Sequence, residues 1–266
     1  MTEPSTNSLD GESLHILVTG ASGGLGGAVA RFYAAPGARL SLWGRDPARL
    51  ETIAQTCRAA GALVLVRSLD IADVPAALAA LREEDAADAF DMVLFCSGRG
   101  DVRAVDARIE DAAMVAHLGT VNFTAPAAMA AAIAERMTAR GHGRIVLVGS
   151  AAAFHALPFA AAYSGTKAGL ARFADALRLA ARPHGVSVTL VSPGFIDTAA
   201  GRKVPGPRPM LMAPDAVAAR IARAAATGKA HLVLPWPFVA LRWFDRLLPR
   251  PLRDRVLAAL TPPEKG

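Results

Sequence analysis

Short apolar runs alternate with longer amphipathic segments along most of this chain. The run at residues 144–149 reads Arg-Ile-Val-Leu-Val-Gly and is rich in β-branched residues, as buried strands are. The segments between such runs carry apolar side chains at helical spacing, and proline or glycine marks many of their ends. We expect strands at residues 14–19, 39–43, 62–67, 92–96, 144–149, 186–191 and 230–234, and helices at residues 25–35, 47–60, 75–84, 163–182 and 214–226, with a further long Ala-rich helix that contains residue 122.

This alternation of strand and helix predicts parallel strands joined by right-handed helical crossovers. The expected fold class is α/β, a doubly wound parallel sheet (Rossmann fold) of about seven strands with helices on both faces. A chain of 266 residues with 53% hydrophobic and 20% charged residues can form one globular domain. We assign residues 14–234 to that domain, residues 235–266 to C-terminal helices of the same domain, and residues 1–13 to a disordered tail.

The first expected strand leads directly into a glycine-rich turn, Gly20-Ala-Ser-Gly-Gly24-Leu-Gly26, and a helix follows. Glycines in such a turn let the backbone approach a pyrophosphate, and the helix N-terminus presents its free N–H groups to the phosphates. The turn therefore predicts a dinucleotide site. Its spacing is Thr-Gly-x-x-x-Gly-x-Gly and not Gly-x-Gly-x-x-Gly.

A second motif places three reactive groups within reach of one substrate oxygen. Ser150 follows the fifth apolar run, so it is expected at the carboxyl end of a strand, where parallel sheets bind ligands. Tyr163 and Lys167 are four residues apart on an expected helix, which puts both side chains on one face. A nearby ammonium lowers the pKa of a phenol, ordinarily about 10. A lone Tyr-x-x-x-Lys is more often a core tyrosine beside a solvated lysine, but Ser150 and the glycine turn favour a catalytic set.

Together these motifs resemble those of the short-chain dehydrogenase/reductase family, over residues 14–198. The resemblance implies that Tyr163 is the general acid/base and that Ser150 hydrogen-bonds the substrate oxygen. Lys167 would lower the pKa of the tyrosine and bind the nicotinamide ribose. Asn122, which lies 28 residues before Ser150 as the family's helical asparagine does, would support a proton relay through a water linked to Lys167. The alternative for Asn122 is an exposed or otherwise satisfied helix residue.

The same resemblance implies the residues that contact the cofactor. They are Gly20, Ser22, Gly24, Leu25, Gly26, Arg45, Asp70, Gly98, Tyr163, Lys167, Pro193, Ile196 and Thr198. Asp70 could equally be a loop or cap residue. Residues 95–98 read Phe-Cys-Ser-Gly where the family typically has Asn-Asn-Ala-Gly, so backbone contacts are expected at Gly98 without the usual asparagine side chain.

The end of the second expected strand favours NADP(H) over NAD(H). In dinucleotide folds an acidic residue at this point binds the ribose 2′-hydroxyl, whereas an Arg accommodates a 2′-phosphate. Gly44 occupies the acidic position and Arg45 follows it. Asp46 precedes Pro47 and is expected to be a helix N-cap rather than a ribose ligand. A second basic residue, common in the glycine turn of NADP-using relatives, is replaced by Gly23.

Charge and cysteine content limit the other classes of function. The net charge is +6, with 12 Lys/Arg against 4 Asp/Glu in residues 201–266, so the rest of the chain is slightly acidic. An anionic substrate or a membrane surface could explain the basic end, and no nucleic-acid module accompanies it, so we expect no nucleic-acid partner. Two cysteines and six scattered histidines indicate neither a disulfide scaffold nor a metal site. We expect no secretory signal and no membrane span, hence a cytoplasmic protein.

The regions that should shape the substrate site carry weaker signals. Residues 151–159 form an apolar loop that predicts a pocket wall, with core packing as the alternative, and His155 is expected to fill space. Residues 199–212 are rich in Gly, Pro and Arg and predict a lid. Aromatic and arginine residues gather in residues 235–260, as in interfacial helices. We expect this tail to cover the pocket or a neighbouring subunit, with a peripheral membrane contact as the alternative.

The sequence thus predicts an NADP(H)-dependent oxidoreductase that transfers hydride between the nicotinamide and a carbonyl or alcohol carbon of a largely apolar small molecule. A homodimer or homotetramer is expected. Two other functions stay open. A non-catalytic dinucleotide-binding sensor or scaffold would have little need of Tyr163 and Lys167, and a sugar-nucleotide epimerase or dehydratase would usually need a larger C-terminal portion than residues 199–266.

Overall fold

The computed structural model describes residues 14–100, 102–103, 107–203 and 206–259, so the expected N-terminal tail lies outside the described residues. Seven parallel strands form one sheet in the order β3-β2-β1-β4-β5-β6-β7. The strands are β1 (His15–Thr19), β2 (Arg39–Gly44), β3 (Leu63–Ser68), β4 (Met92–Phe95), β5 (Gly143–Val148), β6 (Val186–Pro193) and β7 (His231–Leu234). The predicted doubly wound α/β fold is confirmed, and the strand order reverses between β1 and β4.

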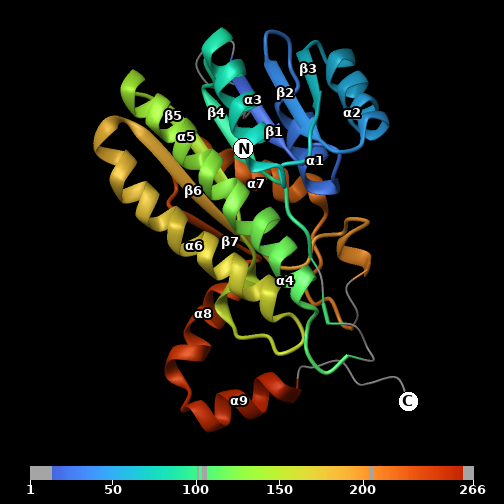
Figure 1. Ribbon diagram of the computed structural model, residues 1–266, viewed down its shortest axis with the longest axis vertical. Helices are drawn as coiled ribbons and strands as arrows, with labels where there is room; N and C mark the ends of the chain where they lie inside the picture. Colours follow the sequence, from blue (N-terminus) through green and yellow to red (C-terminus); the bar gives the residue numbers. More distant parts are fainter. Residues whose placement is uncertain (1–13, 101, 104–106, 204–205, 260–266) are drawn as a thin grey trace, which may run out of the picture.

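Helices cover both faces of the sheet (Figure 1). The helices are α1 (Gly24–Tyr33), α2 (Pro47–Ala59) and α7 (Pro214–Ala226) on one face, and α3 (Val74–Ala87), α4 (Ala112–Gly119), α5 (Ala125–Arg140) and α6 (Ala161–Ala181) on the other. Each face has its own apolar cluster, one built around Leu42, Leu50 and Ile221, the other around Leu17, Leu81 and Ile133. Strands that are apolar on both faces therefore hold the two helical layers together.

Local sequence signals explain where several helices begin and end. Asp46 caps α2 by accepting a hydrogen bond from the Arg49 amide at 3.1 Å, as expected, and Asp73 caps α3 through the Ala76 amide at 3.0 Å. A proline in the first turn follows each cap. Helix α5 ends at Gly141, whose φ of 81° is in the left-handed region that favours glycine.

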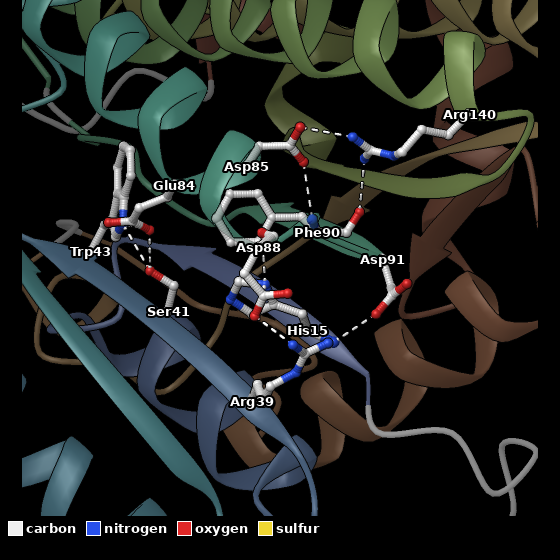
Figure 2. Close-up of polar contacts among 10 residues, drawn as sticks. All are labelled: His15, Arg39, Ser41, Trp43, Glu84, Asp85, Asp88, Phe90, Asp91 and Arg140. Carbon is white, nitrogen blue, oxygen red and sulfur yellow. Dashed lines mark hydrogen bonds and ion pairs between the residues drawn. The ribbon is translucent and has the colours of Figure 1, made fainter.

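Buried polar side chains attach α3 to the sheet and to α5 (Figure 2). The Asp85 carboxylate accepts hydrogen bonds from the Phe90 amide at 3.0 Å and from the Arg140 guanidinium at 2.7 Å, and it also pairs with Arg136. Burial by itself would raise the pKa of Asp85, but the hydrogen bonds from Arg140 and Arg136 outweigh it and hold the pKa below its usual value. The buried charge is thus fully compensated.

Glu84, the neighbour of Asp85, makes the second attachment. Its carboxylate accepts hydrogen bonds from the Ser41 hydroxyl at 2.6 Å and from the Trp43 indole at 3.1 Å, both on β2 (Figure 2), and from Arg67 at 2.6 Å. These contacts join the C-terminal half of α3 to two strands. They involve side chains of α3, β2 and β3 only, so we assign them to the support of the fold.

The C-terminal helices α8 (Phe238–Leu247) and α9 (Arg250–Ala259) follow β7 and extend beyond the sheet and its covering helices (Figure 1). Helix α8 contacts the body through the loop after β5, where the Phe244 and His155 rings lie 5.8 Å apart. His155 also packs against Phe154, so it fills space in this aromatic contact as expected. Within the described part of the chain, no helix has the length and hydrophobicity to cross a bilayer.

Candidate active site

The residues selected from the sequence gather at the carboxyl ends of the strands. Gly20 follows β1, Gly98 follows β4, Ser150 follows β5, and Pro193 ends β6. The reversal of strand order between β1 and β4 opens a crevice at this edge, which is where sheets of this type bind ligands. The sheet topology therefore brings the glycine turn and the Ser-Tyr-Lys motif to the same side of the molecule.

Ser150 and Tyr163 meet across the end of β5. Ser150 begins a 3₁₀ turn and accepts a hydrogen bond from the Ala152 amide at 3.1 Å, and its side chain lies close enough to the Tyr163 phenol to lower the pKa of that phenol. Tyr163 projects from the first turn of α6. Burial raises the pKa of the Tyr163 phenol, and the interaction with Ser150 offsets only part of that rise.

Lys167, one turn further along α6, is 4% exposed. Its ammonium donates a hydrogen bond to the Val148 carbonyl at 2.9 Å, at the end of the strand that carries Ser150. Burial lowers the pKa of Lys167 to about 8, and the nearby Cys96 thiol partly opposes that change. Desolvation of the phenol dominates at Tyr163 and the net shift of its pKa is upward, so the lowering of that pKa by Lys167 stays a prediction.

Asn122 lies in a π-helical turn, Thr120–Thr124, between α4 and α5. It is completely buried, and its amide forms a pair of hydrogen bonds with the backbone of Arg99: Oδ1 accepts from the N–H and Nδ2 donates to the carbonyl, both at 2.8 Å. Asn122 is therefore not exposed, and its bonds to Arg99 agree with the alternative of a satisfied helix residue. A Cβ built on Gly98 would lie 3.2 Å from Lys167 Nζ and 3.3 Å from Asn122 Oδ1. Asn122 thus holds the turn after β4 against Lys167, and the turn has little room for a larger residue than glycine.

The glycine turn is closely packed on both sides. Gly20 has a φ of +69°, and a Cβ there would lie 2.8 Å from the Ser97 backbone. A Cβ on Gly24 would lie 2.5 Å from the Thr198 side chain. Helix α1 begins after Gly23 with no side-chain cap and no acidic residue in its first turn. Its free N–H groups therefore suit the pyrophosphate of a dinucleotide.

The family model for short chain dehydrogenases matches residues 14–207, which include the glycine turn and all three of Ser150, Tyr163 and Lys167. This chain belongs to the short-chain dehydrogenase family. The resemblance drawn from the motifs is confirmed, and the protein is an oxidoreductase of that family.

Individual relatives agree with this assignment. The dehydrogenase is 33% identical over 239 residues to an uncharacterized oxidoreductase of Myxococcus xanthus, across 90% of this chain and 94% of that one. A short-chain dehydrogenase from Sphingobium yanoikuyae, solved in complex with NADPH, superposes with a TM-score of 0.76 at 26% identity, covering 95% of this chain and 98% of that chain. A short-chain dehydrogenase from Mycobacterium paratuberculosis bound to NAD superposes at 0.74 and 21% identity, covering 84% and 96%, and that likeness supports the fold alone.

A cavity of about 340 Å³ adjoins the glycine turn of the dehydrogenase. Its lining includes Gly23, the N-terminal part of α2 and the loop after β6, and it carries three arginines. Arg31 is paired with Asp215 at 2.8 Å and Arg202 with Asp197 at 2.7 Å. The third, Arg49, lies in the first turn of α2. Arg49 is not among the residues expected from the motifs, although its place three residues after the Asp46 cap puts it in the lining that also contains Gly23, where a basic residue is replaced.

Two other expected cofactor residues lie close to each other. The guanidinium of Arg45 is 3.9 Å from the Asp70 carboxylate, and both side chains are largely exposed. Asp70 also accepts a hydrogen bond from the Ala72 amide at 3.0 Å, which agrees with its alternative as a loop residue. Such an exposed pair contributes little free energy, so Arg45 can turn toward another anion at small cost.

The loop after β6 is tied to the glycine turn and to its own far end. Thr198 packs on Gly24 and accepts a hydrogen bond from the Gly201 amide at 3.0 Å. Ile196 forms an isolated parallel β-bridge with Met212, and the Asp197 amide donates a hydrogen bond to the Met212 carbonyl at 2.9 Å. Residues 204–205 of the expected lid lie outside the described residues. The two ends of the loop are therefore held together beside the crevice.

The apolar loop after Ser150 lines a second cavity, of about 570 Å³. The opposite wall is the α6 surface around Ser164, Gly165 and Ala168. That surface is turned away from Tyr163 and Lys167 by about a third of a turn of the helix. The loop is thus a cavity wall, as expected, but the cavity lies beside the three catalytic-type side chains and not directly over them.

Glu110 is a further residue that the sequence did not single out. Helix α6 begins at Ala161 without a side-chain cap from its own N-cap residue. Glu110 supplies one from 52 positions earlier in the chain, because its carboxylate accepts a hydrogen bond from the Ala162 amide at 2.8 Å. This contact holds the turn that carries Tyr163, and only the folded chain brings the two residues together.

Proposed function

We propose that this short-chain dehydrogenase transfers hydride between NADP(H) and a carbonyl or alcohol carbon of a largely apolar small molecule. Tyr163 is the general acid/base. The observation that carries the proposal is the placement of Ser150 beside Tyr163 at the end of β5, with the Lys167 ammonium buried one turn along α6. A hydroxyl, a phenol and a cation around one position suit a reaction in which an oxygen gains negative charge.

In the reductive direction, the substrate carbonyl oxygen would accept hydrogen bonds from Ser150 and Tyr163. The bound nicotinamide supplies the hydride that forms the new C–H bond. As the C=O π electrons move onto oxygen, Tyr163 gives up its proton to that oxygen and the product alcohol forms. Because burial raises the pKa of Tyr163, the phenol is protonated at neutral pH and ready to donate. Lys167 then stabilises the phenolate that remains.

The chain's own residues also account for cofactor binding. The uncapped N–H groups at the start of α1 would bind the pyrophosphate, and the packed glycines keep the turn free of side chains. Arg45 and Arg49 would bind the 2′-phosphate of NADP, since the ion pair that Arg45 would give up, with Asp70, is exposed and Arg49 lines the cavity beside Gly23. Charge-assisted hydrogen bonds of this kind contribute about 1.5 to 3 kcal/mol each.

The test is a panel of apolar ketones assayed with NADPH and with NADH, using the wild type and Tyr163→Phe. The phenylalanine variant keeps the ring and loses the proton donor. NADPH binding should therefore persist while turnover falls by about 100-fold or more. A Tyr163→Phe variant with near wild-type turnover on a confirmed substrate contradicts the assigned mechanism, and equal affinity of the wild type for NADPH and NADH contradicts the cofactor preference.

A further inference from the structure

The outward side of the C-terminal segment carries a stripe of exposed apolar side chains. Its members follow one another at intervals of three and four residues, so they lie along one side of α8 and its preceding turn. They are Trp236, Val239, Trp243 and Leu247, and the two with the largest exposed fractions are Trp236 at 80% and Leu247 at 76%. We call this set the α8 stripe. A soluble surface rarely gathers apolar side chains of this size in one line.

The opposite side of α8 is packed against the body of the protein. Phe238 is buried on Gly194, where an added Cβ would lie 3.1 Å from the phenylalanine ring. The Arg242 guanidinium lies 5.7 Å from the centre of the Phe154 ring, and Phe244 contacts His155. Since these residues already hold α8 in place, the α8 stripe is directed away from the core and from the substrate cavity.

Helix α9 continues the same combination of apolar and basic residues. Leu252 and Val256, four residues apart, are exposed, whereas Leu257 is buried and fixes the helix. Arg250 and Arg255 are exposed on this helix, as Arg242 is on α8. Residues 201–266 carry 12 Lys/Arg against 4 Asp/Glu, while the rest of the chain has a slight excess of acidic residues. Six of those Lys/Arg, against three Asp/Glu, lie in residues 238–266, so the C-terminal helices have a net positive charge beside the exposed apolar side chains.

We propose that α8 and α9 dock this dehydrogenase on an anionic lipid surface. The α8 stripe enters the boundary between headgroups and acyl chains, and the exposed arginines contact the lipid phosphates, as in interfacial amphipathic helices. A second copy of the chain is a poorer occupant. In a two-fold interface the same patch faces itself, so Arg250 and Arg255 would face like charges.

The position of α8 gives this docking a consequence for substrate access. Phe154 and His155 contact α8 through their rings, and both also line the 570 Å³ apolar cavity. A protein held by α8 would therefore have that cavity close to the lipid surface, where apolar carbonyl compounds concentrate. The docking itself does not depend on the proposed hydride transfer, so the two can fail separately.

Vesicle binding tests the proposal with the full-length protein. Sedimentation with equimolar phosphatidylglycerol and phosphatidylcholine should remove the protein from solution at low salt. Phosphatidylcholine alone, or high salt, should leave most of it in the supernatant. The chain has three tryptophans, of which Trp43 is fully buried, so a blue shift of the emission on adding anionic vesicles reports Trp236 and Trp243. No binding to anionic vesicles at low salt overturns the proposal.

Matched variants test whether vesicle binding depends on the α8 stripe or on any exposed apolar side chain. Val239→Glu/Trp243→Glu should weaken vesicle binding by about tenfold or more. Leu63→Glu, which makes the same type of change at a 68% exposed position on β3, should bind as the wild type does. Arg250→Ser/Arg255→Ser leaves the α8 stripe intact and should lose most of the salt-sensitive binding. Thermal melting and turnover in vesicle-free buffer show whether each variant is folded.

The remaining outcomes are equally decisive. If Val239→Glu/Trp243→Glu binds vesicles like the wild type, the α8 stripe is not the docking element. If neither protein binds vesicles and light scattering shows that the variant forms a smaller oligomer than the wild type, the α8 stripe is a subunit interface. Both results overturn lipid docking, and neither affects whether Tyr163 serves as acid/base.

Discussion

Asp85 and Lys167 are both buried charges, yet the fold surrounds them differently. Asp85, near the amino end of β4, receives hydrogen bonds from a backbone amide and from Arg140, and pairs with Arg136. Lys167, near the carboxyl end of β5, donates to the Val148 carbonyl, and among the described residues no carboxylate lies within ion-pair distance of it. The Asp85 carboxylate thus has two charged partners, whereas the partner of the Lys167 ammonium is a neutral carbonyl.

The pKa directions follow from that difference. The arginines more than compensate the burial of Asp85, so its pKa is lowered and its charge is stabilised in the native state. Burial dominates at Lys167 and brings its pKa down to about 8, close to physiological pH. A fully compensated charge supports the fold, whereas an incompletely compensated one remains available to a ligand or a reacting group. Four predictions on Asp85 and Lys167 test this contrast, and two on Arg49 and Glu110 extend it to the cofactor and to the start of α6.

The largest expected effect is on stability, at Asp85. Asp85→Ala leaves two arginines and the Phe90 amide without their acceptor, and breaking a buried pair in this way costs about 3 to 5 kcal/mol. Urea unfolding of the variant and the wild type measures the difference. Asp85→Asn, which keeps an acceptor but not the charge, should lose less. A change below about 1 kcal/mol for Asp85→Ala would show that the cluster is unimportant for stability.

The same site predicts acid sensitivity. Because the pKa of Asp85 is lower in the folded than in the unfolded protein, its contribution to stability is fully present above the ordinary value of 3.8 and is lost as pH falls through the folded pKa. The unfolding free energy of the wild type should therefore decrease more steeply below that pH than that of Asp85→Asn. Parallel curves for the two proteins would contradict the assignment.

The next effect is on activity, at Lys167. Lys167→Met should reduce turnover by about 100-fold, or about 2.7 kcal/mol, because the cation that stabilises the Tyr163 phenolate is lost. Unlike Asp85→Ala, it should leave the urea midpoint unchanged or raised, since it removes an incompletely compensated buried charge. Turnover of Lys167→Met equal to that of the wild type would show that Lys167 has a structural role and no catalytic one.

The pH dependence of reduction follows from the same group. Lys167 is protonated below a pKa of about 8 and loses its charge above it. The rate of ketone reduction, measured in a single turnover with NADPH, should be level at lower pH and fall as pH rises through that value. Oxidation of the alcohol needs the phenolate of Tyr163, whose pKa is raised, and should increase with pH. Parallel pH profiles in the two directions would contradict both roles.

A smaller effect is expected on cofactor choice. Arg49→Ala should weaken NADPH binding by about tenfold, and Arg45→Ala by a similar factor, with little change for NADH, because only NADPH carries the 2′-phosphate. Arg58→Ala, a matched change on the same helix α2 outside the cavity lining, is the control. Isothermal titration with both cofactors measures the ratio, and equal losses for NADPH and NADH would remove the arginines from the 2′-phosphate site.

The smallest effect concerns the start of α6. Glu110→Ala removes the cap on the Ala162 amide and should cost about 1 kcal/mol of stability, with a fall in turnover because Tyr163 lies in the next position of the helix. Glu110→Gln retains a side-chain oxygen and should recover part of both. Denaturation and steady-state assays on the two variants check this, and turnover that is equal to wild type in Glu110→Ala would limit Glu110 to stability.

Much of this protein could be predicted from local sequence. Apolar runs bounded by turn residues predicted the parallel strands, because both faces of such strands are buried whatever their partners. The spacing of Tyr163 and Lys167 placed both side chains on one helical face, and the glycines predicted a close backbone approach after the first strand. The Asp46 cap could also be predicted, since capping depends on neighbours within three residues.

Tertiary structure alone decided the features that depend on residues distant in the chain. The bonds of Asn122 reach 23 positions back to Arg99, and the α6 cap comes from Glu110, 52 positions before Ala162. The pKa of Tyr163 rises because packing removes water from the phenol, and sequence spacing reveals the nearby cation but not that desolvation. Local periodicity determines which elements form, whereas burial and long-range contacts determine the charge and position of each group in the site.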